Sequence, residues 1–151
     1  REARNTLTQR PFASYDQSLP TVGVTKLETG HMKDGDIAGL AIFQDPYGYI
    51  AVKHEPGAKQ IIMVNNGETI ASAPLKGDTV YLRTIASNSS GKATFEYGFD
   101  NKTFTRFGNE LSMKFNLTVF TGNKFCLFNY ATKTSGGYVD FDWFRSEACL
   151  P

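Results

Sequence analysis

The sequence predicts an all-β protein, an antiparallel sandwich of two sheets, and two observations support this. First, short runs rich in β-branched and aromatic residues alternate with turns containing Gly, Asn, Asp or Pro, and aromatic residues make up 13% of the 151 residues. Second, no run shows a helical period and no strand–helix–strand spacing occurs, so the strands are expected to pair antiparallel. A chain of this length suits one domain with its own core.

The first half of the chain divides into strand-like runs separated by turns. Residues 5–12 begin as a strand that stops at Pro11, and 21–29 alternates in polarity. Asn66-Gly67 is a strong hairpin signal between the last two runs of this half. The strands expected here are 5–12, 21–29, 37–44, 49–55, 59–66 and 68–75.

The second half continues this pattern without a linker or a low-complexity tract. Residues 92–99 and 104–108 flank the polar turn 100–103 and are expected to form another hairpin. Residues 1–151 are therefore expected to be a single module, and the first residues suggest either a fragment excised from a larger protein or a mature module. The strands expected in this half are 79–87, 92–99, 104–108, 123–131 and 137–145.

Alternation along a strand decides which side chains share a face. In the run 79–87, Val80 and Leu82 lie opposite Tyr81 and Arg83. Several strands have such a second face that mixes aromatic and charged side chains. This composition is typical of a sheet that binds a ligand or contacts another domain, and an ordinary solvated face is the alternative.

The stretch "SGGYVDFDWFR" contains the only tryptophan and two carboxylates. Period two predicts that Val139, Phe141 and Trp143 pack in the core, while Asp140 and Asp142 point outward. The carboxylates would lie about 6.6–6.8 Å apart, a separation that overlaps the roughly 6.5–9.5 Å used by inverting glycosidases. Any Asp-x-Asp in a strand gives this spacing, and nothing predicts a deep cleft around it. Polar residues of a binding face are therefore expected rather than a catalytic pair.

Composition and motifs exclude several functions. The formal net charge is +1 with scattered basic residues, so no nucleic-acid partner is expected. No apolar run approaches the ~20 residues of a membrane span. His31 and His54 are the only histidines and form no metal-ligand pattern. No nucleophile elbow or phosphate-binding loop occurs, so the motifs do not indicate either of those chemistries.

The two cysteines do not define a cellular compartment. Cys126 lies in an apolar run and is expected to be a buried small hydrophobe, and Cys149 lies near the end of the chain. A disulfide between them stays open at this level.

Several segments together resemble a known family. The stretches "RNTLTQR", "KDGDIAGLAIFQ", "YGYIAVK", "VYLRT", "FEYGFDNKTFTRFG" and "FCLFNYATKTSGGYVDFDWFR" are similar, in order, to the C-terminal concanavalin-A-like β-sandwich of family 43 glycoside hydrolases. The resemblance implies a jelly-roll-like sandwich with one concave sheet. It also implies a secreted enzyme of plant cell-wall degradation, whose catalytic propeller is absent from this chain. In that family the module packs on the propeller and can complete its substrate pocket, and related modules bind xylan.

Taken with the mixed strand faces, the resemblance leads us to expect a non-catalytic module that binds xylan or arabinoxylan on the concave sheet. The alternative is a structural accessory that docks on the catalytic domain without sugar affinity of its own. Aromatic rings complement the C–H faces of sugars, and polar side chains can bond their hydroxyls. The candidate ligand-binding residues, expected on one sheet or at a nearby strand end, are Gln44, Tyr47, Tyr49, Tyr81, Arg83, Phe128, Tyr130 and Asp140.

Asp142 is also a candidate metal ligand. The stretch "DWFR" is similar to the Asp-Tyr-Val-Arg ending of several carbohydrate-active sandwiches, in which the aspartate often binds a structural calcium. In the alternative interpretation, Asp142 pairs with a basic neighbour or caps a turn.

Overall fold

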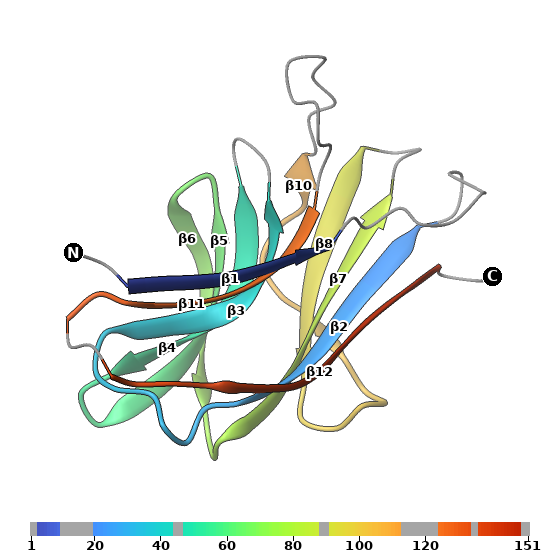
Figure 1. Cartoon of the computed structure of the whole chain (residues 1–151). Helices are drawn as coiled ribbons and strands as arrows, with labels where there is room; N and C mark the ends of the chain where they lie inside the picture. The colour runs from blue at the N-terminus through green and yellow to red at the C-terminus, as the bar shows by residue number, and fades with distance from the viewer. Residues whose placement is uncertain are drawn as a thin grey trace.

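The computed structural model describes residues 3–9, 20–43, 47–87, 91–112, 124–133 and 136–148. These residues form two antiparallel sheets packed face to face, so the predicted all-β sandwich is confirmed (Figure 1). Within the described ranges, no helix is long and apolar enough to cross a membrane.

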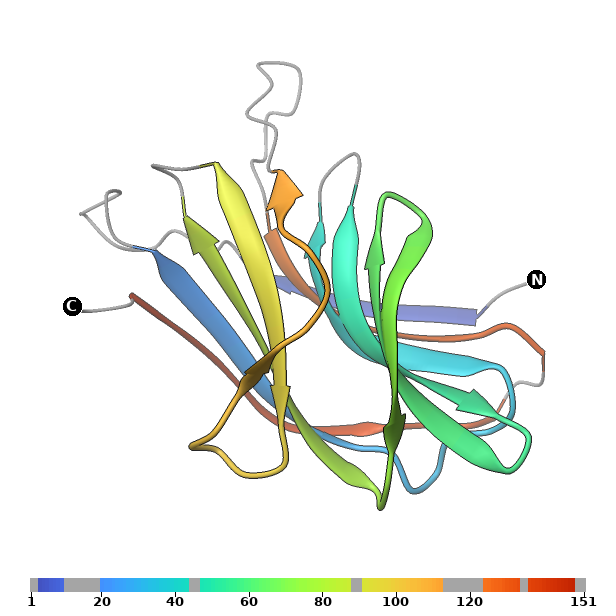
Figure 2. The ribbon, with the colours of Figure 1, turned by 180° about the vertical axis from the view of Figure 1, so that it is seen from behind.

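Sheet A has the strand order β1-β11-β3-β4-β5-β6, and sheet B has the order β10-β8-β7-β2-β12, with β9 beside β8. Figure 1 shows β1 and β12 nearest the viewer, and Figure 2 shows β6 and β8 at the front from the opposite side. The strands are β1 (Ala3–Gln9), β2 (Thr21–Glu28), β3 (Asp36–Phe43), β4 (Gly48–Glu55), β5 (Ala58–Asn65), β6 (Glu68–Leu75), β7 (Thr79–Ser87), β8 (Lys92–Gly98), β9 (Thr105–Arg106), β10 (Leu111–Ser112), β11 (Lys124–Ala131) and β12 (Asp140–Ala148).

Apolar side chains from both sheets fill the space between them. Burying one large apolar side chain contributes roughly 1.5–3 kcal/mol, so this layer supplies the main favourable free energy of folding. The largest fully buried side chains are Phe95, Phe125, Leu27, Leu40, Ile42, Ile50, Ile61, Met63, Leu82, Leu111, Val52 and Val80.

The hairpin of β5 and β6 turns where the sequence predicts it. Asn65 pairs with Glu68, and the two residues between them, Asn66 and Gly67, have φ of 53° and 80°. Both angles suit the tight turn that matches strand twist. In the described residues β6 is an edge strand of sheet A, and it carries Pro74 opposite Gln60.

A β-bulge in β12 overturns one expectation. Phe141 pairs with Leu27 and Trp143 pairs with Lys26, so Asp142 is an extra residue in the strand. Because the bulge shifts the alternation, Phe141 and Phe144 pack on the core while Trp143 faces outward beside Tyr81. The prediction that Trp143 packs in the core with Val139 and Phe141 is therefore wrong.

A polar link joins the two sheets at one end. Lys59 on β5 donates from Nζ to Thr29 Oγ1 at 3.0 Å and contacts Asp78 Oδ1 at 2.5 Å. The Thr29 backbone N–H donates to the Asp78 carbonyl oxygen at 2.7 Å. Thr29 follows β2 and Asp78 precedes β7, so a lysine of sheet A is held between two segments of sheet B.

Candidate functional site

The candidate ligand-binding residues lie on two sheets rather than one. Tyr49 lies on β4, and Phe128 and Tyr130 on β11, all in sheet A, with Tyr47 just before β4. The candidates on sheet B are Tyr81 and Arg83 on β7 and Asp140 on β12. The prediction that they share one sheet is therefore wrong, and Gln44 lies outside the described residues.

On the outer face of sheet A, four candidates form a continuous row of aromatic contacts. Tyr47 and Tyr49 are stacked with centroids 6.0 Å apart, and Tyr49 meets Phe128 edge-on at 5.0 Å. Phe128 and Tyr130 are stacked at 5.9 Å. Tyr49 and Phe128 are nearly buried, at 8% and 7% exposure, whereas Tyr47 is 47% exposed. The row belongs mainly to a second apolar cluster.

Small residues make this second cluster possible. A Cβ at Gly39 would lie 2.2 Å from the Ile50 carbonyl oxygen and 2.6 Å from Ala51 Cα, so only glycine fits between β3 and β4. Other members of the cluster are Ile37, Ala41, Ala51, Ile62, Val64 and Cys126. Cys126 is a free, buried thiol, as its apolar run predicts, and Cys149 lies outside the described residues.

Burial raises the pKa of Tyr49 well above its usual range. The nearby Tyr130 adds to this shift, both by its charge when ionised and by a side-chain hydrogen bond with Tyr49. Tyr49 therefore stays a neutral phenol at any physiological pH. Its hydroxyl orders the row rather than taking part in acid–base chemistry.

The outer face of sheet B has a different composition. Trp143, turned outward by the bulge, lies 6.0 Å from Tyr81, and Lys26 lies between them in the register of β12, β2 and β7. The Arg145 guanidinium lies 4.9 Å from the centre of the Trp143 ring. We call Trp143 and Tyr81 the aromatic platform. Both side chains are half-buried, so each ring is held in place and still reaches solvent.

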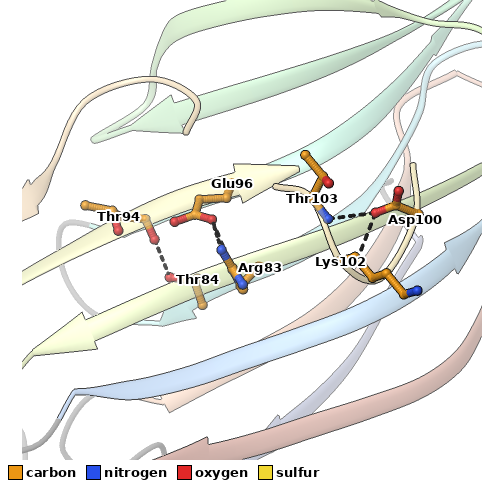
Figure 3. A network of polar contacts seen from close by, with 7 residues as sticks. All are labelled: Arg83, Thr84, Thr94, Glu96, Asp100, Lys102 and Thr103. Carbon is orange, nitrogen blue, oxygen red and sulfur yellow. Dashed lines mark hydrogen bonds and ion pairs between the residues drawn. The ribbon is translucent and has the colours of Figure 1, made fainter. Parts of the chain in front are cut away.

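Arg83 is fixed beside this platform by two partners. Its Nε donates to Glu96 Oε2 at 3.0 Å, and a second guanidinium nitrogen contacts the same oxygen (Figure 3). The guanidinium also lies 3.9 Å from the centre of the Phe104 ring. Glu96 is 7% exposed, so this pair is shielded from water more than a surface pair would be.

The turn after β8 presents Phe104 to Arg83. Asp100 Oδ1 accepts hydrogen bonds from the backbone N–H groups of Thr103 at 2.7 Å and Lys102 at 2.9 Å (Figure 3). These two bonds, the Thr103 bond foremost, lower the pKa of Asp100. The turn is thus ordered by its own aspartate, as its composition predicts.

The surroundings of Asp142 match the alternative of a basic neighbour. Lys26 Nζ lies 3.3 Å from Asp142 Oδ2, and the hydrogen bond between them raises the pKa of Lys26. Lys26 thus provides a cationic partner for Asp142, and the structural calcium that the resemblance implies stays a prediction. Among the described residues, no group of three His, Cys, Asp or Glu side chains is arranged to hold a metal.

Asp140 and Asp142 are both exposed on the surface of β12. A glycosidase acid needs a water-excluding environment that holds its proton near neutral pH. This surface offers no such environment, and it supports the interpretation of the two carboxylates as polar residues of a face.

Sequence reasoning missed Trp143 and Arg145 as residues of this face. Their direction depends on the extra residue Asp142, and a bulge becomes visible only when the partner strand is known. The one available signal was the run of aromatic and charged residues itself. Strict alternation assigned Trp143 to the core face, which is the wrong side of the strand.

Comparison with known proteins gives consistent results. Residues 1–147 match the family model described as the β-xylosidase C-terminal concanavalin A-like domain. A β-xylosidase of Formosa agariphila is 34% identical over 144 residues, which are 94% of this chain and 23% of that protein.

Two solved structures are also similar. A bifunctional GH43-CE protein of Bacteroides eggerthii superposes with a TM-score of 0.88 at 36% identity, covering 97% of this chain and 19% of its own. A GH43 glycoside hydrolase, engineered to display both endo-xylanase and exo-arabinofuranosidase activity, gives a TM-score of 0.83 at 28% identity, covering 96% of this chain and 31% of its own. The chain thus spans less than a third of each of these relatives.

Proposed function

The chain belongs to the family of β-xylosidase C-terminal concanavalin A-like domains, and from this premise we propose that it binds xylan-type polysaccharide on the outer face of sheet B. It is a C-terminal accessory domain of GH43 glycosidases, and the catalytic domain lies outside these 151 residues. The proposed role is to hold the substrate close to an associated catalytic domain.

The observation that carries this proposal is the aromatic platform. Trp143 and Tyr81 present rigid rings whose electron-rich faces attract the polarised C–H groups of a sugar ring. Charged side chains that can bond sugar hydroxyls lie next to the rings, among them Lys26, Arg83 and Asp142. A few well-placed polar groups beside aromatic side chains are typical of small-molecule sites.

The outer face of sheet A suits a sugar less well. Its cluster is mostly aliphatic and has 0–8% exposure, with Tyr47 as the one highly exposed ring of the row. A polysaccharide needs hydrogen-bonding partners for its many hydroxyls, and an aliphatic surface leaves them unpaired. We therefore assign the sheet A row to packing within the module.

Xylan is proposed as the polymer because of the relatives. One is a β-xylosidase, and another displays endo-xylanase and exo-arabinofuranosidase activity. A domain that keeps substrate near such chemistry would bind the same backbone. Completion of the catalytic pocket by this module and secretion of the enzyme stay predictions.

The single tryptophan allows a direct test on the unmodified chain. Titration with xylohexaose should change the emission of Trp143 in a saturable manner, because the ligand would cover the indole. Tyr81→Ala should weaken binding by about fivefold or more, since loss of one stacking ring costs roughly 1 kcal/mol. Affinity electrophoresis on xylan gives an independent measure.

Tyr47→Ala is the matched control, because Tyr47 is an exposed tyrosine of the other sheet. It should leave both the fluorescence titration and the electrophoretic retardation unchanged. If the emission of Trp143 does not respond and xylan does not retard the chain, the proposed function is wrong. If Tyr47→Ala abolishes binding and Tyr81→Ala does not, the site lies on sheet A.

A further inference from the structure

We propose that the ligand of the aromatic platform carries a carboxylate, as a uronic acid branch on the xylan backbone. This inference depends on the proposed function, because it names the substrate class of the same site. It rests on the charges that the strand register places on the two sides of the platform.

On one side, cross-strand pairing aligns three arginines. Arg145 of β12 pairs with Val24 of β2, and Val24 pairs with Arg83 of β7. Arg83 pairs with Glu96 of β8, and Glu96 pairs with Arg106 of β9. We call these five residues the arginine row, and its three arginines and one glutamate leave it net positive.

On the other side, the register aligns oxygen-bearing side chains. Asp140 pairs with Glu28, and Glu28 pairs with Thr79, whose hydroxyl donates to Glu28 Oε2 at 2.6 Å. A ligand across the platform would therefore meet acceptors for its hydroxyls on this side and guanidinium groups on the other. The charge of the face therefore changes along the strands, from the arginine row at one end of the platform to the acceptor groups at the other.

Arg145 is the member of the arginine row best placed to meet an anion. Its guanidinium lies over the Trp143 ring, and no carboxylate among the side chains that the structure describes forms an ion pair with it. Arg83, by contrast, is already held by Glu96. Stacking on an indole leaves the N–H edges of a guanidinium directed sideways, which is the geometry for a bidentate carboxylate.

The nearby carboxylates whose side chains the structure describes do not cancel this preference. Asp142 is paired with Lys26 at 3.3 Å, and Lys26 also lies 3.7 Å from Glu28. Asp140 and Arg145 lie on opposite sides of Trp143 along β12. The positive potential at Arg145 is therefore the feature that distinguishes a branched acidic ligand from a neutral one.

The test compares two matched ligands, xylotetraose and the same tetramer bearing one glucuronic acid. The acidic tetramer should bind the chain about fivefold more tightly, the factor that corresponds to a partly exposed ion pair of about 1 kcal/mol. Calorimetry or Trp143 emission would measure both constants. Added salt should weaken binding of the acidic tetramer and leave that of the neutral one unchanged.

Arg145→Gln should bring the ratio of the two affinities to about one, whereas Lys102→Gln in the turn after β8 should leave both affinities unchanged. The salt dependence of the unmodified chain tests the same point without a substitution. Equal affinity for both tetramers overturns this inference and leaves the proposed function standing. If neither tetramer binds, both are overturned.

Discussion

At the scale of single residues, Thr25 supports the backbone of the bulge in β12. It is completely buried on β2, and its hydroxyl donates to the Trp143 carbonyl oxygen at 2.7 Å. A bulge takes backbone groups out of the regular ladder, and a buried carbonyl without a donor costs free energy. Thr25 therefore stabilises the backbone that turns Trp143 outward.

Thr25→Val should lower the free energy of unfolding by about 1 kcal/mol, because it keeps the shape of the side chain and removes the donor of a partly buried hydrogen bond. Urea denaturation measures the change, and a shift in Trp143 emission would report the altered bulge. Thr105→Val, exposed on β9, is the control and should stay within about 0.5 kcal/mol of the parent. Equal costs for the two variants would contradict the role given to Thr25.

The period-two alternation of the strands correctly predicted for many side chains whether they face the core or point away from it. Ile50 and Val52 face the core and Tyr49 faces away, as period two requires. The rule failed at Trp143 because it assumes one residue per pleat. An inserted residue breaks that assumption, and its position depends on contacts with β2 that a single strand does not encode.

At the scale of elements, local signals were reliable and long-range pairing was not. The turn at Asn66-Gly67 joins neighbouring strands, and turn chemistry alone predicts it. Tyr49 on β4 and Phe128 on β11 meet only because β3 pairs with both strands. The strand that carries Tyr81, β7, also alternates aromatic and charged residues with apolar ones, yet it belongs to the other sheet. The sequence therefore identified mixed faces but not which faces coincide.

The bulge in β12 should tolerate deletion of its extra residue. Without Asp142, Phe141 would precede Trp143 directly, and regular alternation would still put Phe141 and Phe144 in the core. The deleted chain should keep a cooperative thermal transition in far-UV circular dichroism, at a slightly lower midpoint because Lys26 loses one of its two carboxylate partners.

Deletion of Thr84 from the regular strand β7 provides the contrast. It would turn every following side chain of that strand to the opposite face, so cooperative unfolding should be lost. If loss of Asp142 is as damaging as loss of Thr84, the extra residue is required for more than the register of β12.

At the scale of the whole molecule, the link of Thr29, Lys59 and Asp78 responds to pH. The hydrogen bond from Lys59 lowers the pKa of the Asp78 carboxyl below its unfolded value of about 3.9. A depressed pKa means that the ionised group favours the folded state. The contribution is therefore complete above the unfolded pKa and is lost as pH falls through the folded one.

Asp78→Asn should lower the melting temperature at about pH 6, and the difference from the parent should disappear near about pH 2. Thermal unfolding at several pH values measures this convergence. Lys59→Met should give the same pH dependence, because it removes the other partner of the pair. A difference that stays constant down to the lowest pH would rule out this pair as the pH-dependent link between the sheets.

The proline in β6 has a consequence for how copies of the protein behave at high concentration. β6 ends sheet A within the described residues, and a strand edge of this kind can recruit the same edge of another molecule. Pro74 has no N–H to offer, so an incoming strand would find its hydrogen-bond ladder interrupted. The edge of β6 is therefore expected to be a poor template for edge-to-edge association of copies at high protein concentration.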